Sequence, residues 1–350
     1  MTKRAIILFN LGGPDRPDSV QPFLFNLFND PAIIGAPGPV RWLIAKLIST
    51  RRAPVAREIY AHLGGGSPLL GLTEDQARAL ETALASKEPT TQSKVFVCMR
   101  YWHPMSDAVA REVKAYGPDE IVLLPLYPQY SGTTSGSSIK DWQRAAKAIG
   151  LSKPTRTVCC YPQEAGFIAA VADLTAKALD ASRGAVGESA RLLFSAHGLP
   201  KKVIEGGDPY QAQVEQSAAA VVARLARPDL DWRVCYQSRV GPLEWIGPST
   251  EDEIRRAGKD GKAIVLVPIA FVSEHSETLV ELDIEYRELA EEVGVTAYHR
   301  VPAVATQEAF VQGLADMVLG ASLGEPLSHL GHRLCSADRS QCPCPMEKAS

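Results

Sequence analysis

The chain has 350 residues, of which 45% are hydrophobic and 22% are charged, and its net charge is −3. This length suits about two domains with a sizeable buried core. The slightly acidic balance, without a long basic run, argues against a nucleic-acid-binding protein. No apolar run reaches the ~18–20 residues of a transmembrane helix, and the short apolar stretch after the opening MTKR lacks the cleavage site of a signal peptide. We therefore expect a cytoplasmic protein, with peripheral contact to the inner membrane left open.

Short β-branched runs alternate with longer amphipathic stretches along the chain. The runs predict buried strands and the stretches predict helices. The predicted strands are 4–10, 94–100, 120–126, 191–197, 232–238 and 262–271, and the clearest helices between them are 73–86 and 208–226. This alternation predicts an α/β fold with parallel sheets.

The two halves of the chain resemble each other. The stretch IVLLPLYPQYS at 121–131 matches IVLVPIAFVSE at 264–274, and other motifs pair in the same order. The repeat predicts two α/β domains of similar topology, which we place at residues 1–150 and 151–320, followed by a cysteine-rich C-terminal extension at 321–350. The alternative is coincidence, because strands followed by Gly or Pro look alike.

The first half is longer because residues 20–70 form an extra apolar segment. It contains FLFNLFNDPAIIGAPGPVRWLIAKLIST, two amphipathic pieces broken by Pro and Gly. Such a segment can wall an apolar pocket or rest on a bilayer surface. An ordinary helical hairpin fits the pattern equally well.

A cation and two aromatic residues follow the second predicted strand, in MRYWHP at 99–104. Ligands of open α/β sheets bind beyond the carboxyl ends of the strands. Arg100 and Tyr101 are therefore candidates to contact a flat, partly anionic ligand. The alternative is a core aromatic pair beside a surface arginine.

A histidine ends the strand predicted from RLLFSAH. His197 lies at the edge where a site would form, and the glycine after it lets a ligand approach closely. A histidine that serves only the local structure is the alternative.

Carboxylates crowd the end of the strand predicted at 262–271. Glu274, His275 and Glu277 lie at the junction with a predicted helix, and Glu281 and Glu285 follow at the four-residue spacing of one helical face. Like charges at this spacing disfavour a helix. The alternatives are a solvated acidic surface and a line of carboxylates that passes cations or protons to a site. Carboxylate with imidazole suits Fe²⁺ and also general base catalysis.

Three of the seven cysteines, Cys335, Cys342 and Cys344, lie close together near the C-terminus. Structural disulfides are unexpected in a cytoplasmic protein, so clustered cysteines indicate a metal site. Such a site usually has four ligands. From the spacing, zinc and a 2Fe–2S cluster both remain open.

The fourth ligand has to come from elsewhere in the chain. Cys98 and Cys235 lie inside predicted strands and are expected in the core. The adjacent pair Cys159 and Cys160 ends a strand before a proline, which is a better place for a ligand.

Together the motifs resemble those of the ferrochelatases, enzymes that insert Fe²⁺ into a porphyrin to make haem. They run in family order across nearly the whole chain, and the fifth and seventh are highly specific. The motifs are FNLGGP (9–14), GGGSP (64–68), RYWHP (100–104), LPLYPQYS (124–131), FSAHGLP (194–200), CYQSRVGP (235–242) and SEHSETLVELDIEY (273–286). The resemblance implies two Rossmann-like domains with a porphyrin cleft between them, and protoporphyrin IX as substrate. It also implies that the segment 20–70 is a lip of that cleft.

The same resemblance implies residue roles. His197 and Glu277 would be the catalytic pair that handles Fe²⁺ and the pyrrole protons, with the division of work between them left open. Arg100 and Tyr101 would lie near the porphyrin. His62 stands where some relatives carry an arginine. The supporting residues implied are Glu274, His275, Glu281 and Glu285.

Some bacterial ferrochelatases have a similar Cys-x6-Cys-x-Cys tail and hold a 2Fe–2S cluster. The resemblance implies the ligands Cys335, Cys342 and Cys344, with Cys160 favoured over Cys159 because it lies directly before a YP turn. Such a cluster would be structural or a redox sensor rather than catalytic. Coproporphyrin as the substrate and the oligomeric state are left open.

Overall fold

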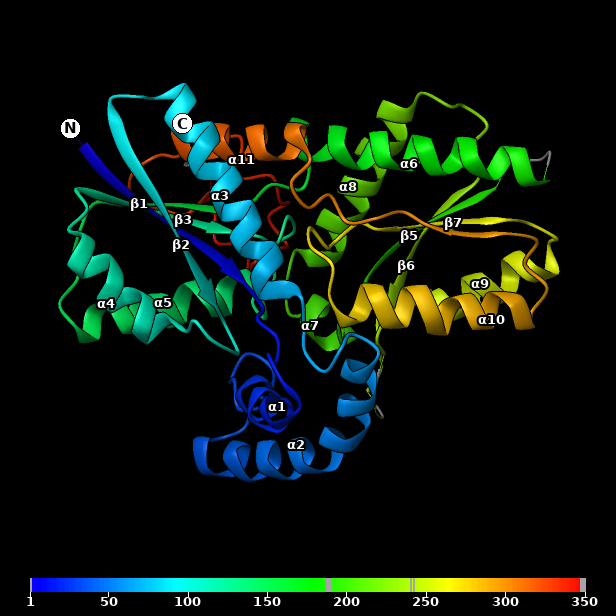
Figure 1. The fold of residues 1–350 in the computed structure, drawn as a ribbon, viewed down its shortest axis with the longest axis horizontal. Helices are drawn as coiled ribbons and strands as arrows, with labels where there is room; N and C mark the ends of the chain where they lie inside the picture. The colour runs from blue at the N-terminus through cyan, green and yellow to red at the C-terminus, as the bar shows by residue number, and fades with distance from the viewer. Residues whose placement is uncertain (1, 187–189, 240, 242, 347–350) are drawn as a thin grey trace. The chain divides into compact units, whose positions relative to one another are not determined.

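The computed structural model describes residues 2–186, 190–239, 241 and 243–346 (Figure 1). The chain divides into two compact units. Unit 1 comprises residues 1–160, 314–334 and 343–350, and unit 2 comprises residues 161–313 and 335–342. None of the described helices combines the length and the apolar character that a bilayer span requires.

Unit 1 is built on a five-stranded parallel sheet with the order β2-β1-β3-β4-β9. Its strands are β1 (Thr2–Asn10), β2 (Thr91–Met99), β3 (Glu120–Pro125), β4 (Thr155–Cys160) and β9 (Leu327–Ser328). The apolar run of β1, from Ala5 to Phe9, is at most 1% exposed. A strand buried on both faces is typical of a parallel sheet that helices cover on both sides.

Three helices of unit 1 cover this sheet: α3 (Leu69–Lys87), α4 (Ser106–Tyr116) and α5 (Ser135–Ala148). Alternate residues of β1, such as Ile7 and Phe9, pack in one core cluster with Val109 of α4 and Trp142 of α5. The rings of Phe9 and Trp142 meet edge to face at 6.4 Å. This packing places α4 and α5 over one face of β1.

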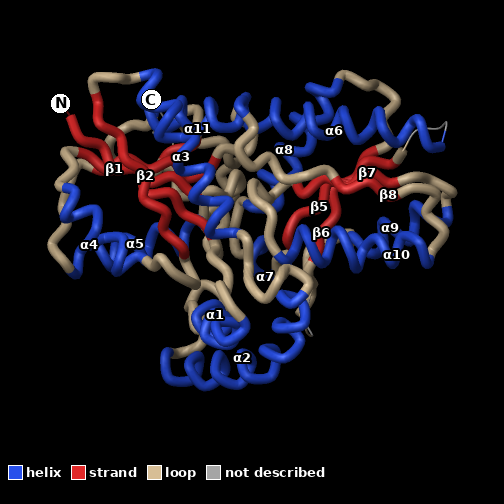
Figure 2. The backbone as a smooth tube through the Cα atoms, in the orientation of Figure 1, coloured by secondary structure: helices blue, strands red, loops and turns tan. Residues whose placement is uncertain are grey.

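The extra segment of the first half forms a helical hairpin of α1 (Val20–Phe28) and α2 (Gly38–Ala61), preceded by a short 3₁₀ turn, η1 (Pro17–Ser19). Figure 2 shows the two helices side by side at the edge of unit 1, away from its sheet. Val20, Phe23 and Leu24 of α1 share a small core cluster with Tyr60 of α2 and with Tyr101. We call these two helices and the loop between them the hairpin.

Unit 2 is built on a four-stranded parallel sheet with the order β6-β5-β7-β8. Its strands are β5 (Arg191–His197), β6 (Trp232–Gln237), β7 (Ile264–Pro268) and β8 (Tyr298–Arg300). Its helices are α6 (Ala165–Val186), α7 (Lys201–Glu205), α8 (Tyr210–Leu225), α9 (Thr250–Lys259), the π-helix η2 (Glu277–Glu285) and α10 (Tyr286–Glu292), which continues η2; α11 (Glu308–Gly320) runs from unit 2 into unit 1.

The two sheets share one strand order: second, first, third, fourth. The predicted α/β fold with parallel sheets is thus confirmed, and the common order is what the sequence repeat predicted. The sheet of unit 1 is completed by β4 and β9. The domain bounds predicted from the sequence place residues 155–160 in the second domain and residues 327–328 in the C-terminal extension.

Candidate active site

The end of β5 brings an imidazole to a carboxylate within unit 2. His197 is the last residue of β5, and Glu277 is the first residue of η2. The Nδ1 atom of His197 lies 2.8 Å from Oε2 of Glu277, and the side chains are 40% and 27% exposed. The pair is therefore partly buried but still open to a ligand.

The local sequence explains how each member is placed. A Cβ atom on Gly198 would lie 2.9 Å from the carbonyl oxygen of Gln237, so only glycine permits this close approach of the chain after His197. Before Glu277, the backbone N–H of His275 donates to Oγ1 of the buried Thr278 at 3.0 Å. This turn starts the π-helix at the glutamate.

The two groups shift each other's protonation. Burial lowers the pKa of His197, but the attraction of Glu277 and their hydrogen bond outweigh it, so the pKa is raised above 6.5. Burial raises the pKa of Glu277, but His197 outweighs it and brings the pKa to about 2. Each group thus favours the charged form of the other, a carboxylate at Glu277 and an imidazolium at His197.

A second carboxylate, Glu281, collects donors next to this pair. It accepts hydrogen bonds from the Ser238 N–H at 2.8 Å, from the Ser238 hydroxyl at 2.5 Å, from Nε2 of Gln237 at 3.0 Å and from the Tyr286 hydroxyl at 3.1 Å. Burial and the neighbouring Glu277 carboxylate raise the pKa of Glu281. One glutamate is held ionised and the next is biased towards protonation, a combination suited to proton transfer.

Sequence reasoning missed Gln237, Ser238 and Tyr286 as site residues. Ser238 has a φ of +59°, a region that non-glycine residues rarely occupy. This backbone directs its N–H to Glu281, while its hydroxyl also lies 3.5 Å from Oε2 of Glu277. The sequence signal that could have found Gln237 and Ser238 is their place at the carboxyl end of β6, which lies next to β5 in the sheet.

The other predicted members of the acidic group differ in their surroundings. His275 is buried, its pKa is lowered by burial, and its Nδ1 accepts the backbone N–H of Glu277 at 3.1 Å. Glu274 instead contacts Arg300 at 2.6 Å and the backbone N–H of Ala303 at 2.8 Å. Glu285 is exposed at the last position of η2.

The helix that carries these glutamates is a π-helix, whereas the four-residue spacing predicts an α-helix. The wider turn of a π-helix, with i to i+5 hydrogen bonds, changes where successive side chains point. The carboxylates of Glu277 and Glu281 still lie on the same side of the helix, since both are within reach of the Ser238 hydroxyl.

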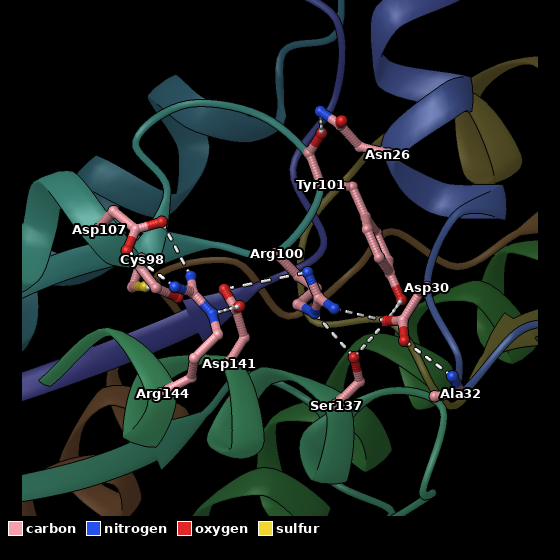
Figure 3. Close-up of polar contacts among 11 residues, drawn as sticks. Asn26, Asp30, Ala32, Cys98, Arg100, Tyr101, Asp107, Ser137, Asp141 and Arg144 are labelled. Carbon is pink, nitrogen blue, oxygen red and sulfur yellow. Dashed lines mark hydrogen bonds and ion pairs between the residues drawn. The ribbon is translucent and has the colours of Figure 1, made fainter. Parts of the chain in front are cut away.

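Arg100 and Tyr101 lie in unit 1, directly after β2. Both turn to one carboxylate, that of Asp30 (Figure 3). Tyr101 is 1% exposed, and the Arg100 side chain is 15% exposed.

The cysteines fall into three groups. Cys98 and Cys235 are buried in β2 and β6, as predicted. In unit 1, the Sγ atom of Cys159 lies 3.7 Å from that of Cys160 and 3.4 Å from that of Cys344. In unit 2, Cys335 accepts a hydrogen bond from Nε2 of Gln213 at 3.1 Å, and Cys342 is buried. Within the described part of the chain, no three His, Cys, Asp or Glu side chains are grouped so that they could hold a metal ion.

Solved structures of similar architecture define the fold class of this chain. SirB from Bacillus subtilis, solved with Fe³⁺, matches with a TM-score of 0.52 over 91% of this chain and 95% of its own, at 11% identity. DR2241 from Deinococcus radiodurans, described as similar to chelatases, matches with a TM-score of 0.51 over 93% of this chain and 57% of its own, at 14% identity. Two parallel sheets of one strand order thus give this chain a chelatase-type α/β fold.

Sequence comparison is more specific. The model of the family Ferrochelatase matches residues 3–322. Relatives named ferrochelatase are 58% identical in Caulobacter vibrioides, over 98% of this chain and 97% of theirs, and 47% identical in Rickettsia bellii, over 99% and 98%. The chain belongs to the ferrochelatase family.

Proposed function

We propose that this chain inserts Fe²⁺ into protoporphyrin IX to form protohaem, the terminal step of haem synthesis. The observation that carries the proposal is the 2.8 Å contact between His197 and Glu277 at the end of β5, in a chain of the ferrochelatase family. A protein that only bound a porphyrin would not need an imidazole and a carboxylate that shift each other's pKa.

The chemistry requires the porphyrin to lose two pyrrole N–H protons as the metal enters. Glu277 engages Nδ1 of His197, so Nε2 is the ring nitrogen left for the substrate. In its neutral form His197 accepts a pyrrole proton there, and the carboxylate of Glu277 stabilises the imidazolium that forms. Fe²⁺, the second substrate, suits the same imidazole and carboxylate as transient ligands.

The proton then needs an exit. Glu281 lies beside Glu277 through their common contact with Ser238, and its raised pKa makes it the carboxylate that most readily takes a proton. His275 supports the start of the π-helix through its contact with the Glu277 N–H, and Glu285 lies at the exposed end of this helix.

Anaerobic metal insertion tests the function. Free protoporphyrin fluoresces, and we expect its fluorescence to fall when Fe²⁺ and the protein are both present. If fluorescence fell with coproporphyrin but not with protoporphyrin, coproporphyrin would be the substrate. Tight binding of both without loss of fluorescence would indicate a carrier.

A 2Fe–2S cluster held by Cys160, Cys335, Cys342 and Cys344 is the finer proposal for the tail. Thiolates are the ligands such a cluster takes. In unit 1 the sulfur of Cys344 lies 3.4 Å from that of Cys159, which lies 3.7 Å from that of Cys160. The tail therefore brings a thiol to the end of β4, and this contact is made by Cys159 rather than by the proposed ligand Cys160. When bound, the cluster would supply a redox-active, structurally linking group. The family model ends at residue 322, before the tail cysteines, which agrees with a role outside the metal insertion step.

Replacing Cys344 with serine is expected to abolish the cluster, because one of four ligands is lost. Acid-labile sulfide, bound iron and the visible absorption of the purified protein measure it. Cys160→Ser and Cys159→Ser form a matched pair, of which only the first should lose the absorption. If only Cys159→Ser lost the absorption, the fourth ligand would be Cys159 rather than Cys160.

Peripheral membrane contact is the finer proposal for the hairpin, and with it we propose that the protein is cytoplasmic and lies at the inner membrane. On α2, Trp42, Leu43 and Leu47 are 49%, 63% and 51% exposed. The same helix carries cationic side chains, among them Arg51 and Arg52. Exposed apolar side chains beside cations suit an anionic lipid surface.

Leu43→Asp with Leu47→Asp is expected to weaken binding to vesicles that contain anionic lipid by about tenfold or more, since each leucine gives up apolar burial. Flotation of the protein with vesicles measures the bound fraction. Leu323→Asp is the matched control, because Leu323 is 59% exposed and lies outside the hairpin. Equal flotation of both variants would contradict the proposal.

A further inference from the structure

We propose that Asp30 is a positioning residue whose buried carboxylate fixes the hairpin to the end of β2 and the start of α5. Arg100 and Tyr101 then act on the porphyrin through Asp30 rather than by touching it. The attachment of the hairpin stands on geometry alone, whereas the effect on porphyrin binding rests on the proposed function.

Donors from separate segments of unit 1 converge on this carboxylate (Figure 3). Asp30, which follows α1, is 3% exposed. Its Oδ2 atom accepts hydrogen bonds from Nη2 of Arg100 at 2.8 Å, from the Tyr101 hydroxyl at 2.8 Å and from the hydroxyl of Ser137 in α5. Its Oδ1 atom accepts the backbone N–H of Ala32 at 2.8 Å. Several donors to one buried charge make a strong and geometrically specific contact.

Arg100 is engaged along its whole guanidinium group. Besides the bond to Asp30, its Nε donates to the Ser137 hydroxyl at 2.7 Å, and its Nη1 lies 3.9 Å from Asp141. Its Cζ lies 4.9 Å from the centre of the Tyr101 ring. A direct porphyrin contact would have to break this arrangement, so an indirect role is the one the geometry supports.

Among the described residues, few other polar contacts attach the hairpin to the remainder of unit 1. The buried residues of the 24-residue helix α2 are Ala45, Ser49, Ala53 and Tyr60. In α1, Nδ2 of Asn26 donates to the carbonyl of Tyr101 at 3.1 Å. Arg41 of α2 donates to the carbonyls of Asn29 and Ala36, which braces the connecting loop internally. Among the residues that the structure describes, the carboxylate of Asp30 is therefore the charged link between this loop and the end of β2.

Neutralising that link should have two consequences. The largely buried guanidinium of Arg100 would lose its close ionic partner, and such a group is costly to leave unpaired. The hairpin, which in the proposed function borders the porphyrin, would then be less firmly held. Porphyrin binding should suffer more than the chemical step, because His197 and Glu277 lie on other elements.

The test compares Asp30→Asn, Tyr101→Phe and the double variant, each in the full chain. Hydrogen exchange of amides in α1 and α2 is expected to accelerate about tenfold in Asp30→Asn, relative to α4 and α5. KM for protoporphyrin should rise about tenfold, with a smaller change in kcat. The double variant should match Asp30→Asn, because the Tyr101 hydroxyl acts through the carboxylate already changed. Asp107→Asn, which alters an exposed carboxylate bonded to Arg144, is the control.

The outcomes separate the steps. Unchanged exchange in Asp30→Asn would overturn the attachment, whatever the activity. Additive effects of the two substitutions on KM would overturn the indirect role and indicate that Tyr101 meets the porphyrin. If wild type itself inserts no metal, the proposed function fails while the exchange result still decides the attachment. Should Asp30→Asn fold poorly, Tyr101→Phe removes a single donor and should give a smaller acceleration in the same helices; none would overturn the attachment.

Discussion

Replacing His197 with alanine is expected to lower kcat for Fe²⁺ insertion about 10²–10⁴-fold, which is the usual contribution of a positioned general acid–base group. The imidazole lies at the carboxyl end of β5 with Nδ1 engaged by Glu277, and alanine removes the Nε2 atom that would face the substrate. Alanine leaves the strand and the close turn at Gly198 intact. Protoporphyrin should therefore still bind with an affinity near that of the wild type.

Two measurements on one preparation separate these effects. The rate of fluorescence loss after addition of Fe²⁺ gives metal insertion, and titration of protoporphyrin without metal gives binding. His332→Ala is the control, because the His332 side chain is exposed and its Nδ1 lies 3.2 Å from the carbonyl oxygen of Leu330 in its own loop. Imidazole added to the His197→Ala protein should restore part of the rate. A normal rate in this variant would remove His197 from the mechanism.

The sequence predicted the strands that carry the site better than the hydrogen-bond partners of the site residues. The strands ending at His197 and before Glu277 were predictable because apolar, β-branched runs followed by polar residues are local signals. Their common sheet edge followed from parallel topology. Gln237 ends the neighbouring strand β6 and Ser238 follows it, yet both were missed. The role of Ser238 depends on a positive φ that its residue type does not suggest.

Long-range partners explain the remaining differences. Glu274 lies in the same acidic stretch as Glu277, yet its carboxylate contacts Arg300, which is 26 residues away. Arg100 and Asp30 are 70 residues apart, and nothing in the local pattern of either segment pairs them. The π-helix, too, depends on packing that a spacing of glutamates does not encode.

Glu277→Gln is expected to change the pH dependence of catalysis as well as its rate. In the wild type, Glu277 raises the pKa of His197, so the neutral imidazole that accepts a pyrrole proton forms only above that raised value. Glutamine removes this attraction while burial, which lowers the pKa of His197, remains. The acid limb of kcat/KM should therefore move to lower pH. The plateau should fall about 10²-fold or more, because the imidazolium that forms loses its counterion.

The same substitution should alter stability with a predictable sign. The lowered pKa of Glu277 gives stability that is present above its ordinary value of 4.5 and lost as the pH falls towards about 2. The raised pKa of His197 gives stability that is present below its ordinary value of 6.5 and lost as the pH rises through the raised value. The pair thus stabilises the fold most between about 4.5 and 6.5. Urea unfolding at pH 5.5 and pH 8.5 should show a larger loss for Glu277→Gln at the lower pH.

The direction in which the acid limb of kcat/KM shifts then shows which group accepts the pyrrole proton. Movement to lower pH, with Glu288→Gln as an exposed control on α10 behaving as wild type, would make the neutral imidazole of His197 the acceptor and Glu277 its counterion. An acid limb that stays in place while the rate falls would mean that the titrating acceptor is not His197. The carboxylates would then take the protons, with Glu281 as the best placed because burial and Glu277 raise its pKa. Fe²⁺ would in that case be delivered from the imidazole side.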